Sequence, residues 1–262
     1  MRINFLFMRH ANSCQNLVGN VINDNKARNE LMKEYRDPTL SDMGKQDSIK
    51  TGIKLKENIS KFDIVGTSTM IRTIETAYFT NSGMGNPFKE IYVFPYLREI
   101  LSETINIDDP EENIKANEEI LKNEVHSIKR LDAQEDYFKI QGIDEYINYI
   151  YIRDNILRNQ PGNIDTFINW FCKNVIYNYI NKRPFLNILI ITHAHVIRQF
   201  SNEEIQPNNN MGFILRVNCE RKNDDVEIIY DKNDIIEVDL DINRTELKCP
   251  MERCSNVCNY IN

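Results

Sequence analysis

The residues of this chain best suited to chemistry are its histidines and the polar groups beside them. The chain has four His, and three of them directly follow apolar runs. His10 follows residues 3–8, and His193 and His195 follow residues 187–192. A neutral imidazole can act as a nucleophile or bind a metal ion, and the guanidinium of Arg9 can bind an anion. The two segments therefore form a candidate site if the fold brings them together.

The elements around these segments predict how that happens. The two apolar runs are short and rich in aromatic or β-branched residues, which favours buried strands. Other segments predict strands at 62–67, 91–96, 211–217 and 226–230, and helices at 27–35, 41–60 (with Ser41 as N-cap) and 70–80. Strands that alternate with helices indicate an α/β fold, a three-layer α/β/α arrangement with a mostly parallel central sheet. Ligands of such sheets bind beyond the carboxyl ends of the strands, where His10 and His193 stand.

The domain organisation is predicted to be simple. We expect a single domain over residues 1–245, with a helical lid inserted at about 102–185, followed by a Cys-containing tail at 246–262. The charged stretch 113–139 and the periodic stretches 143–157 and 164–181 predict the helices of that lid.

Composition narrows the class of partner and the compartment. The net charge of −7 gives no electrostatic footprint for nucleic acid or an anionic membrane, so an anionic substrate would need a local basic pocket. No segment has the apolar length of an export signal or a membrane span. We therefore expect a cytoplasmic protein whose six Cys are reduced, with Cys249, Cys254 and Cys258 in a mobile tail. A metal or disulfide role for these three thiols is the alternative.

Five segments, in this order along the chain, resemble the histidine phosphatase superfamily, whose members are phosphoglycerate mutase-like in fold. Residues 9–16 are similar to its Arg-His-Gly signature followed by Asn. The other four are residues 37–46 (Asp-x-x-Leu-Ser-x-x-Gly-x-x-Gln), 67–77 (Ser-Ser-Pro-x-x-Arg-x-x-x-Thr-Ala), 97–99 (Leu-x-Glu) and 190–198 (the second-histidine strand). Together they span about three quarters of the chain.

The resemblance implies an activity and a set of site residues. It implies hydrolysis of a phosphomonoester through a phosphohistidine, without metal or cofactor. The implied catalytic residues are His10, Glu99 and His193, and the implied phosphate-binding residues are Arg9, Asn16, Arg72 and His193. The partner would be a small phosphorylated substrate, with a phosphoprotein also open and the oligomeric state undetermined. Phosphoglycerate mutase-type transfer and an inactive phosphate-binding or scaffold protein are the alternatives.

Physical chemistry favours the same roles. Phosphoryl transfer is catalysed mostly by positioning and by stabilising charge on the phosphoryl oxygens, for which the planar fork of Arg is well suited. A neutral His10 can attack phosphorus, and a protonated carboxyl must then protonate the leaving oxygen. Glu99 is the candidate for that acid, and Glu103, one helical turn further, is the alternative.

Two departures from the family pattern bear on activity. Ala11 and Ala194 stand where the family has Gly, and a positive φ at either position would cost Ala about 1 kcal/mol. A rival hypothesis comes from His193 and His195, since residues two apart on a strand share a face and can bind a metal. A metallohydrolase would lose activity in EDTA, and a phosphohistidine enzyme would not.

Overall fold

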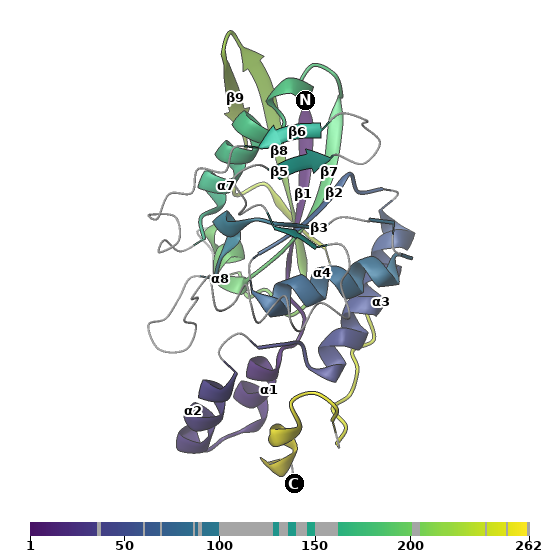
Figure 1. Ribbon diagram of the computed structural model, residues 1–262, viewed down its shortest axis with the longest axis vertical. Helices are drawn as coiled ribbons and strands as arrows, with labels where there is room; N and C mark the ends of the chain where they lie inside the picture. Colours follow the sequence, from purple (N-terminus) through teal and green to yellow (C-terminus); the bar gives the residue numbers. More distant parts are fainter. Residues whose placement is uncertain are drawn as a thin grey trace.

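A computed structural model of the chain shows its fold (Figure 1). It describes residues 1–35, 38–59, 61–68, 70–85, 87–88, 91–99, 128–130, 136–139, 146–149, 162–200, 205–238, 240–249 and 251–260. The strands are β1 (Arg2–Arg9), β2 (Ile64–Thr67), β3 (Ile91–Val93), β4 (Ile128–Arg130), β5 (Asp136–Lys139), β6 (Tyr146–Tyr149), β7 (Phe185–Thr192), β8 (Gly212–Lys222), β9 (Asp225–Ile229) and β10 (Ile235–Val238). The α-helices are α1 (Cys14–Val21), α2 (Asn25–Glu34), α3 (Asp42–Asn58), α4 (Ile71–Gly83), α7 (Ile164–Trp170) and α8 (Ala194–Ile197). Shorter helical turns are η1 (Pro95–Leu97), η2 (Phe171–Val175, a π-helical turn), η3 (Tyr177–Tyr179), η4 (Arg198–Phe200) and η5 (Ser255–Tyr260).

A mixed, mostly parallel sheet is the centre of the molecule. Its strand order is β10-β8-β1-β7-β2-β3-β4, and β9 pairs with β8. Strands β1, β7, β2, β3 and β4 are parallel, whereas β8 is antiparallel to β1, β9 and β10. Strands β5 and β6 form a separate antiparallel pair. Since β1 and β7 lie side by side in the middle of the sheet, the residues that follow them meet at one edge.

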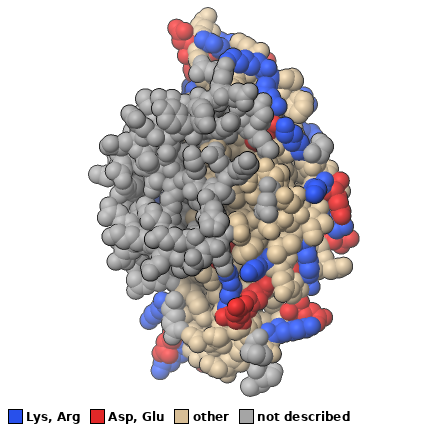
Figure 2. Space-filling view, turned by 45° about the vertical axis from the view of Figure 1, so that its right-hand side comes forward, with Lys and Arg blue, Asp and Glu red and all other residues tan. Residues whose placement is uncertain are grey.

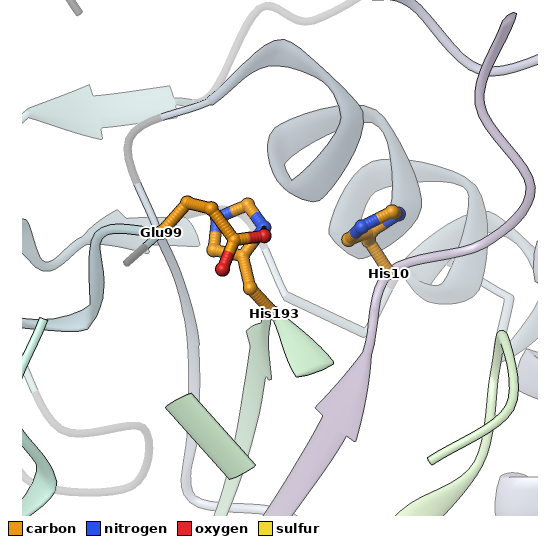
Figure 3. Close-up of side chains that lie close together, drawn as sticks. All are labelled: His10, Glu99 and His193. Carbon is orange, nitrogen blue, oxygen red and sulfur yellow. Dashed lines mark ion pairs between the residues drawn. The ribbon is translucent and has the colours of Figure 1, made fainter. Parts of the chain in front are cut away.

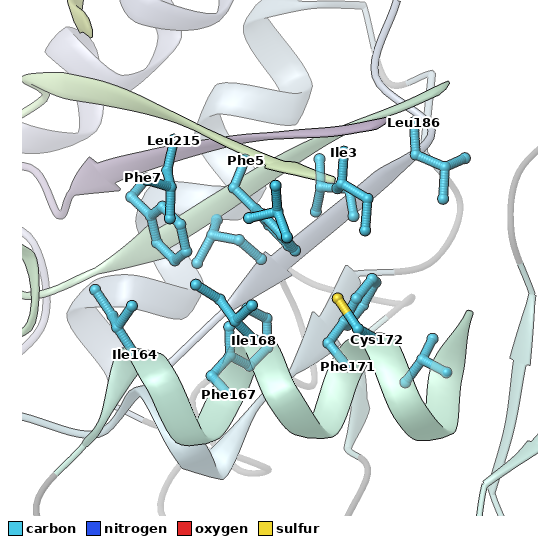
Figure 4. Close-up of a cluster of buried hydrophobic side chains, with 14 of the residues drawn as sticks. Ile3, Phe5, Phe7, Ile164, Phe167, Ile168, Phe171, Cys172, Leu186 and Leu215 are labelled. Atoms are coloured by element: carbon cyan, nitrogen blue, oxygen red, sulfur yellow. The ribbon is translucent and has the colours of Figure 1, made fainter. Parts of the chain in front are cut away.

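One face of the sheet packs against α7 and η2. The alternate residues Ile3, Phe5 and Phe7 of β1 point to this face (Figure 4). The rings of Phe5 and Phe7 there meet those of Phe167 and Phe171. The ring centroids of Phe5 and Phe171 are 5.5 Å apart and nearly perpendicular, a favourable geometry for aromatic pairs. This cluster fixes the register of β1, because a slip by one residue would turn these rings to the other face.

The opposite face packs against α3 and α4. Leu6 and Met8 of β1 join Leu189 and Leu55 in a second buried cluster. Helices α3 and α4 approach closely at Gly52, where a Cβ would collide with the carbonyl oxygen of Thr80. With helices on both faces, the molecule has the three-layer architecture that the sequence predicts (Figure 1).

Most predicted elements are confirmed, with two kinds of error. The strands at 3–8, 62–67, 91–96, 187–192, 211–217 and 226–230 are present with somewhat different ends, as are the helices at 27–35, 41–60 and 70–80. The prediction missed α1 and β10. Helices were predicted at 113–139 and 143–157, and this is wrong where the structure describes these segments, since β4, β5 and β6 are strands. The rest of both segments lies outside the described residues. The predicted helix at 164–181 is α7 and its continuation, and the helical lid at 102–185 stays a prediction.

The prediction that the thiols of the C-terminal tail are reduced is wrong, and the alternative, a disulfide role, is the one that the structure shows. Disulfides join Cys14 to Cys254 and Cys249 to Cys258. Cys172 and Cys219 are free and buried, so the prediction of reduced thiols holds for these two residues. Residues 240–249 and 251–260, here named the C-terminal strap, run along the molecule to α1 (Figure 1). Sequence spacing could not show this, because Cys14 and Cys254 are 240 residues apart.

The compartment prediction loses its support for the same reason. Disulfides are typical of oxidising environments, and the cytoplasmic location was inferred from reduced thiols. Across the described ranges, no helix combines the length and apolar character needed to cross a bilayer.

Candidate active site

His10 lies at the carboxyl end of β1, next to the end of β7. The parallel register pairs Arg9 with Thr192, and the His10 amide donates to the Thr192 carbonyl at 2.9 Å. His193 is therefore the residue that follows β7 at the same level, and its ring centroid is 5.3 Å from that of His10 (Figure 3). Both side chains are buried. The structure thus brings the two predicted histidines together.

The hydrogen bonds of His10 define its tautomer. Arg72 Nε lies 3.2 Å from His10 Nε2, and a guanidinium N–H can only donate, so Nε2 accepts. The proton is then on Nδ1, which donates to the Ala11 carbonyl at 2.8 Å. Burial, followed by the charges of Arg72 and Arg9, holds the pKa of His10 well below its ordinary value of 6.5. His10 is therefore a neutral imidazole whose Nε2 lone pair faces the Arg72 guanidinium.

This environment gives a prediction for pH. Because the folded pKa is depressed, His10 should remain neutral as the pH falls through 6.5 and should gain a proton only at more acidic pH. Two-bond ¹H–¹⁵N NMR spectra of the ring nitrogens, assigned with His10→Ala, should show no titration of His10 near pH 6.5. The same protein unfolded in urea is the control, since its histidines should titrate near the ordinary pKa of about 6.5. A midpoint near 6.5 in the folded protein would contradict the assigned environment.

Arg72 is the hub of the site. It stands in the first turn of α4 and is buried with 3% of its surface exposed. Besides His10, its Nη2 lies 3.3 Å from Glu99 Oε2 and 3.3 Å from His193 Nδ1. One guanidinium therefore contacts all three residues predicted to be catalytic.

Glu99 is held beside the histidines by the end of the sheet. The Thr192 hydroxyl donates to the Leu97 carbonyl at 3.0 Å, which anchors the segment two residues before Glu99. Burial alone would raise the pKa of Glu99, but the His193 imidazole, a hydrogen bond from His195 and the Arg72 guanidinium outweigh it and hold the pKa well below its usual range. The carboxyl is thus ionised in this state. The alternative acid, Glu103, lies outside the described residues.

His193 is buried and His195 is not, which bears on the rival metal hypothesis. His193 Nε2 is 3.0 Å from the Ser68 hydroxyl, and its Nδ1 is 3.2 Å from Glu99 Oε2. Burial lowers the pKa of His193 despite the nearby Glu99 carboxylate. His195 belongs to α8 rather than to a strand, has a side chain 55% exposed, and contacts the other carboxylate oxygen, Oε1, at 3.0 Å. The premise that the two histidines share a strand face is therefore wrong.

A different group of residues has the composition of a metal site. Ligand atoms of His10, Glu99 and His193 lie within 4.8 Å of one another (Figure 3). All three residues already contact the Arg72 guanidinium, which is a fixed positive charge at the place a cation would take. The donor set around Arg72 fits an anion better than a metal ion, because a divalent cation would be repelled by Arg72 and by nearby Arg9.

Arg9 and Asn16 are the other two residues predicted to bind phosphate. Arg9 Nη1 donates to the Pro207 carbonyl at 2.8 Å, and burial lowers its pKa to about 10. Its Nε has no hydrogen-bond partner among the residues that the structure describes. Asn16 Oδ1 caps α1 by accepting from the Ser13 amide at 3.2 Å. A role for Asn16 in binding phosphate therefore stays a prediction, alongside a helix-capping role that the structure shows.

The structure adds site residues that the sequence analysis did not assign. Ser68 orients His193, and Asn209 Nδ2 donates to the His10 carbonyl at 2.8 Å. Thr76 Oγ1 accepts from the Ala11 amide at 3.0 Å. Ser68 and Thr76 stand within the motif at 67–77, so their position was the available signal. Asn209 stands in a run of three Asn, which indicates only a loop.

Ala in place of Gly leaves the backbone of the site unstrained. Among the described residues, the non-glycine positions with positive φ are Asn210, Asn223, Asp241 and Cys254, so Ala11 and Ala194 avoid that region. A glycine is needed instead at Gly44 in α3, which packs on residues 11–13, here named the His10 loop. A Cβ at Gly44 would collide with the carbonyl oxygen of Asn12, so its absence lets α3 pack directly on the His10 loop.

The positive charge of the site is local. On the described surface that Figure 2 shows, Lys and Arg are interspersed with Asp and Glu, and neither sign forms a continuous patch. By contrast, Arg9 and Arg72 are concentrated beside His10, with Glu99 as the acidic group of the hub. This arrangement suits attraction of a small anion to the residues around His10.

The chain resembles several solved structures, with low sequence identity to each. No family model and no curated protein matches the chain. Among solved structures, ecdysone phosphate phosphatase from Bombix mori has 13% identity and a TM-score of 0.46, covering 94% of this chain and 96% of that one. Phosphoglycerate mutase from Bacillus anthracis has 14% identity and a TM-score of 0.43, covering 88% and 94%. Phosphoserine phosphatase from Entamoeba histolytica, in complex with 3-phosphoglyceric acid, has 15% identity and a TM-score of 0.40, covering 87% and 96%.

The structures that resemble the chain over most of its length are thus histidine phosphatase superfamily members, phosphatases and a mutase.

Proposed function

We propose that the protein hydrolyses small phosphomonoesters through a phosphohistidine at Nε2 of His10. The observation that supports this most is the Arg72 hub, in which one buried guanidinium contacts His10 Nε2, His193 and Glu99. A substrate phosphoryl group would compete for the same donors and would then lie beside the nucleophilic nitrogen.

The chemistry follows from the roles of these side chains. Nε2 of His10 attacks phosphorus while the ester oxygen leaves, taking a proton from the Glu99 carboxyl. Water then attacks the phosphohistidine, Glu99 recovers the proton, and inorganic phosphate leaves with His10 restored. Arg72, Arg9 and His193 would stabilise the phosphoryl oxygens in both steps.

Glu99 must change its protonation state for this sequence. Its pKa is lowered by the His193 imidazole, by the hydrogen bond from His195 and by the Arg72 guanidinium. A phosphate anion that takes over the Arg72 donors adds negative charge next to the carboxyl, and both effects raise the pKa of Glu99. Substrate binding would thereby prepare the acid.

The proposal is tested by assaying p-nitrophenyl phosphate in EDTA from about pH 4 to about pH 8. We expect turnover that EDTA leaves unchanged. Loss of activity in EDTA would favour a metal-dependent hydrolase instead. If the ester is not hydrolysed at all, turnover of phosphoglycerate separates a mutase from an inactive phosphate-binding protein.

Glu99→Gln gives a specific prediction for the acid. We expect esters with poor leaving groups, such as simple alkyl phosphates, to be slowed by about 10²- to 10⁴-fold, because their leaving oxygen needs a proton. For p-nitrophenyl phosphate, a good leaving group, the loss should be far smaller. The measurement is kcat/KM for both ester classes, with Glu103→Gln as the matched variant. If Glu103→Gln shows the selective loss and Glu99→Gln does not, the acid is Glu103.

A further inference from the structure

The C-terminal strap contacts α4, the helix that carries Arg72, through a buried ion pair. Arg253 Nη1 lies 2.7 Å from Glu75 Oε1, and the Glu75 side chain is only 1% exposed. Glu75 stands on α4 one helical turn after Arg72. The carboxylate that receives Arg253 is therefore on the same helix as the hub of the site.

Glu75 in turn holds the segment that clamps the His10 loop. Its second oxygen, Oε2, accepts from the Leu40 amide at 2.6 Å. The neighbours of Leu40 bind the loop directly: the Cys14 amide donates to the Thr39 carbonyl and the Ser41 amide to the Asn12 carbonyl, both at 3.0 Å. A continuous path of short contacts thus links Arg253 to the residues that follow His10.

A covalent bond fixes the strap at the same place. Cys254, adjacent to Arg253, is joined to Cys14 at the start of α1, four residues after His10. Cys254 has a φ of 57°, a conformation that non-glycine residues adopt only when their surroundings impose it. The Arg253 amide also donates to Asp42 Oδ2 at 3.0 Å. The backbone of Arg253 is therefore held by its own amide hydrogen bond and by the disulfide of the next residue.

We infer that Arg253 is a positioning residue for the His10 loop and that the Cys14–Cys254 disulfide holds it there, so that cutting this disulfide lowers turnover. Without Arg253, the buried Glu75 carboxylate loses the positive charge beside its Oε1, which disturbs the hydrogen bond that its Oε2 accepts from the Leu40 amide, and the loop that orients His10 loosens. The inference rests on the proposed function for its kinetic consequence, and on geometry alone for its effect on the loop.

The disulfide can be tested by itself in a suitable variant. Cys249→Ser/Cys258→Ser removes the disulfide that lies wholly within the strap and leaves Cys14–Cys254 as the bond between strap and α1. Dithiothreitol supplies two electrons and two protons, converts that bond to two thiols, and becomes its own cyclic disulfide. Mass spectrometry after alkylation under denaturing conditions should show two additional modified thiols.

Two readouts follow in that variant, before and after reduction. After reduction, we expect amide hydrogen exchange to accelerate in peptides that contain the Ala11, Cys14 and Leu40 amides. We also expect kcat for p-nitrophenyl phosphate to fall about 10- to 100-fold with little change in KM, because the nucleophile is misplaced while Arg72 remains. The oxidised variant should match the wild type. Unchanged exchange and unchanged kcat after complete reduction would overturn the inference.

Side-chain variants separate positioning from a general loss of stability. Arg253→Met should reproduce the loss of kcat, and Arg253→Lys should recover most of it, because Lys restores a positive charge beside Glu75. Equal losses in Arg253→Lys and Arg253→Met would contradict the role of the ion pair. If the wild type does not hydrolyse p-nitrophenyl phosphate, the proposed function fails, and the exchange measurement still decides whether the strap orders the loop.

Discussion

Replacing His10 by Ala is expected to lower turnover of p-nitrophenyl phosphate by about 10⁵-fold or more, because it removes the atom that forms the covalent intermediate. The structure gives this expectation a specific atom. Nε2 is the unprotonated nitrogen, it faces Arg72, and the depressed pKa keeps it available in acid. Steady-state kinetics of the purified wild type and variant are the measurement.

The covalent intermediate provides an independent check of the same prediction. Wild-type protein quenched rapidly with a ³²P-labelled phosphomonoester should carry phosphate that is labile in acid and stable in base, as a phosphorus–nitrogen bond is. His10→Ala should carry none. His126→Ala, which replaces a histidine outside all five motif segments, is the matched control and should be labelled like the wild type. Labelling of His10→Ala would place the nucleophile elsewhere.

The fold was predictable where burial imposes a period on the sequence. Strand β7 is buried on both faces and reads as a continuous apolar run, and α3 begins at the predicted N-cap Ser41, whose side chain accepts from the Gly44 amide. The charged stretch that contains β4 and β5 carries no such period, so its strands were read as helices. Helix α1 was missed although Cys14, Leu17 and Val18 form a buried face at helical spacing, because the helix is only 8 residues long and its Asn and Gly residues are typical of loops.

The site was predictable as a set of residues but not as a network. Strand ends identify His10 and His193, because parallel strands deliver the residues that follow them to one edge of the sheet. The sequence does not show that one guanidinium contacts both histidines and Glu99, since that depends on where α4 begins relative to β2. The pairing of Cys14 with Cys254 is likewise a product of the tertiary fold.

Arg72→Ala should lower kcat/KM by about 10³- to 10⁴-fold, because the loss of one stabilising donor in a buried site already costs about 10²- to 10³-fold and Arg72 offers several. The variant would also leave Glu99 and the two histidines without their shared cation. Arg72→Lys should still lose about 10²-fold, since a single ammonium cannot reproduce the planar fork. The assay is hydrolysis of p-nitrophenyl phosphate, together with the Kd for inorganic phosphate.

The control for Arg72→Ala is a variant that removes one Arg charge far from the site residues. Arg216 is exposed on β8, and Arg216→Ala should leave kcat/KM and the phosphate Kd unchanged. If Arg72→Ala lowers kcat/KM while the phosphate Kd stays at its wild-type value, Arg72 acts only in the transition state. If both stay at wild-type values, the hub does not bind the phosphoryl group, and the proposed function loses the observation that supports it most. A parallel loss in both is the expected result, because the donors that would bind the phosphate ground state are the same ones that would meet the charge of the transition state.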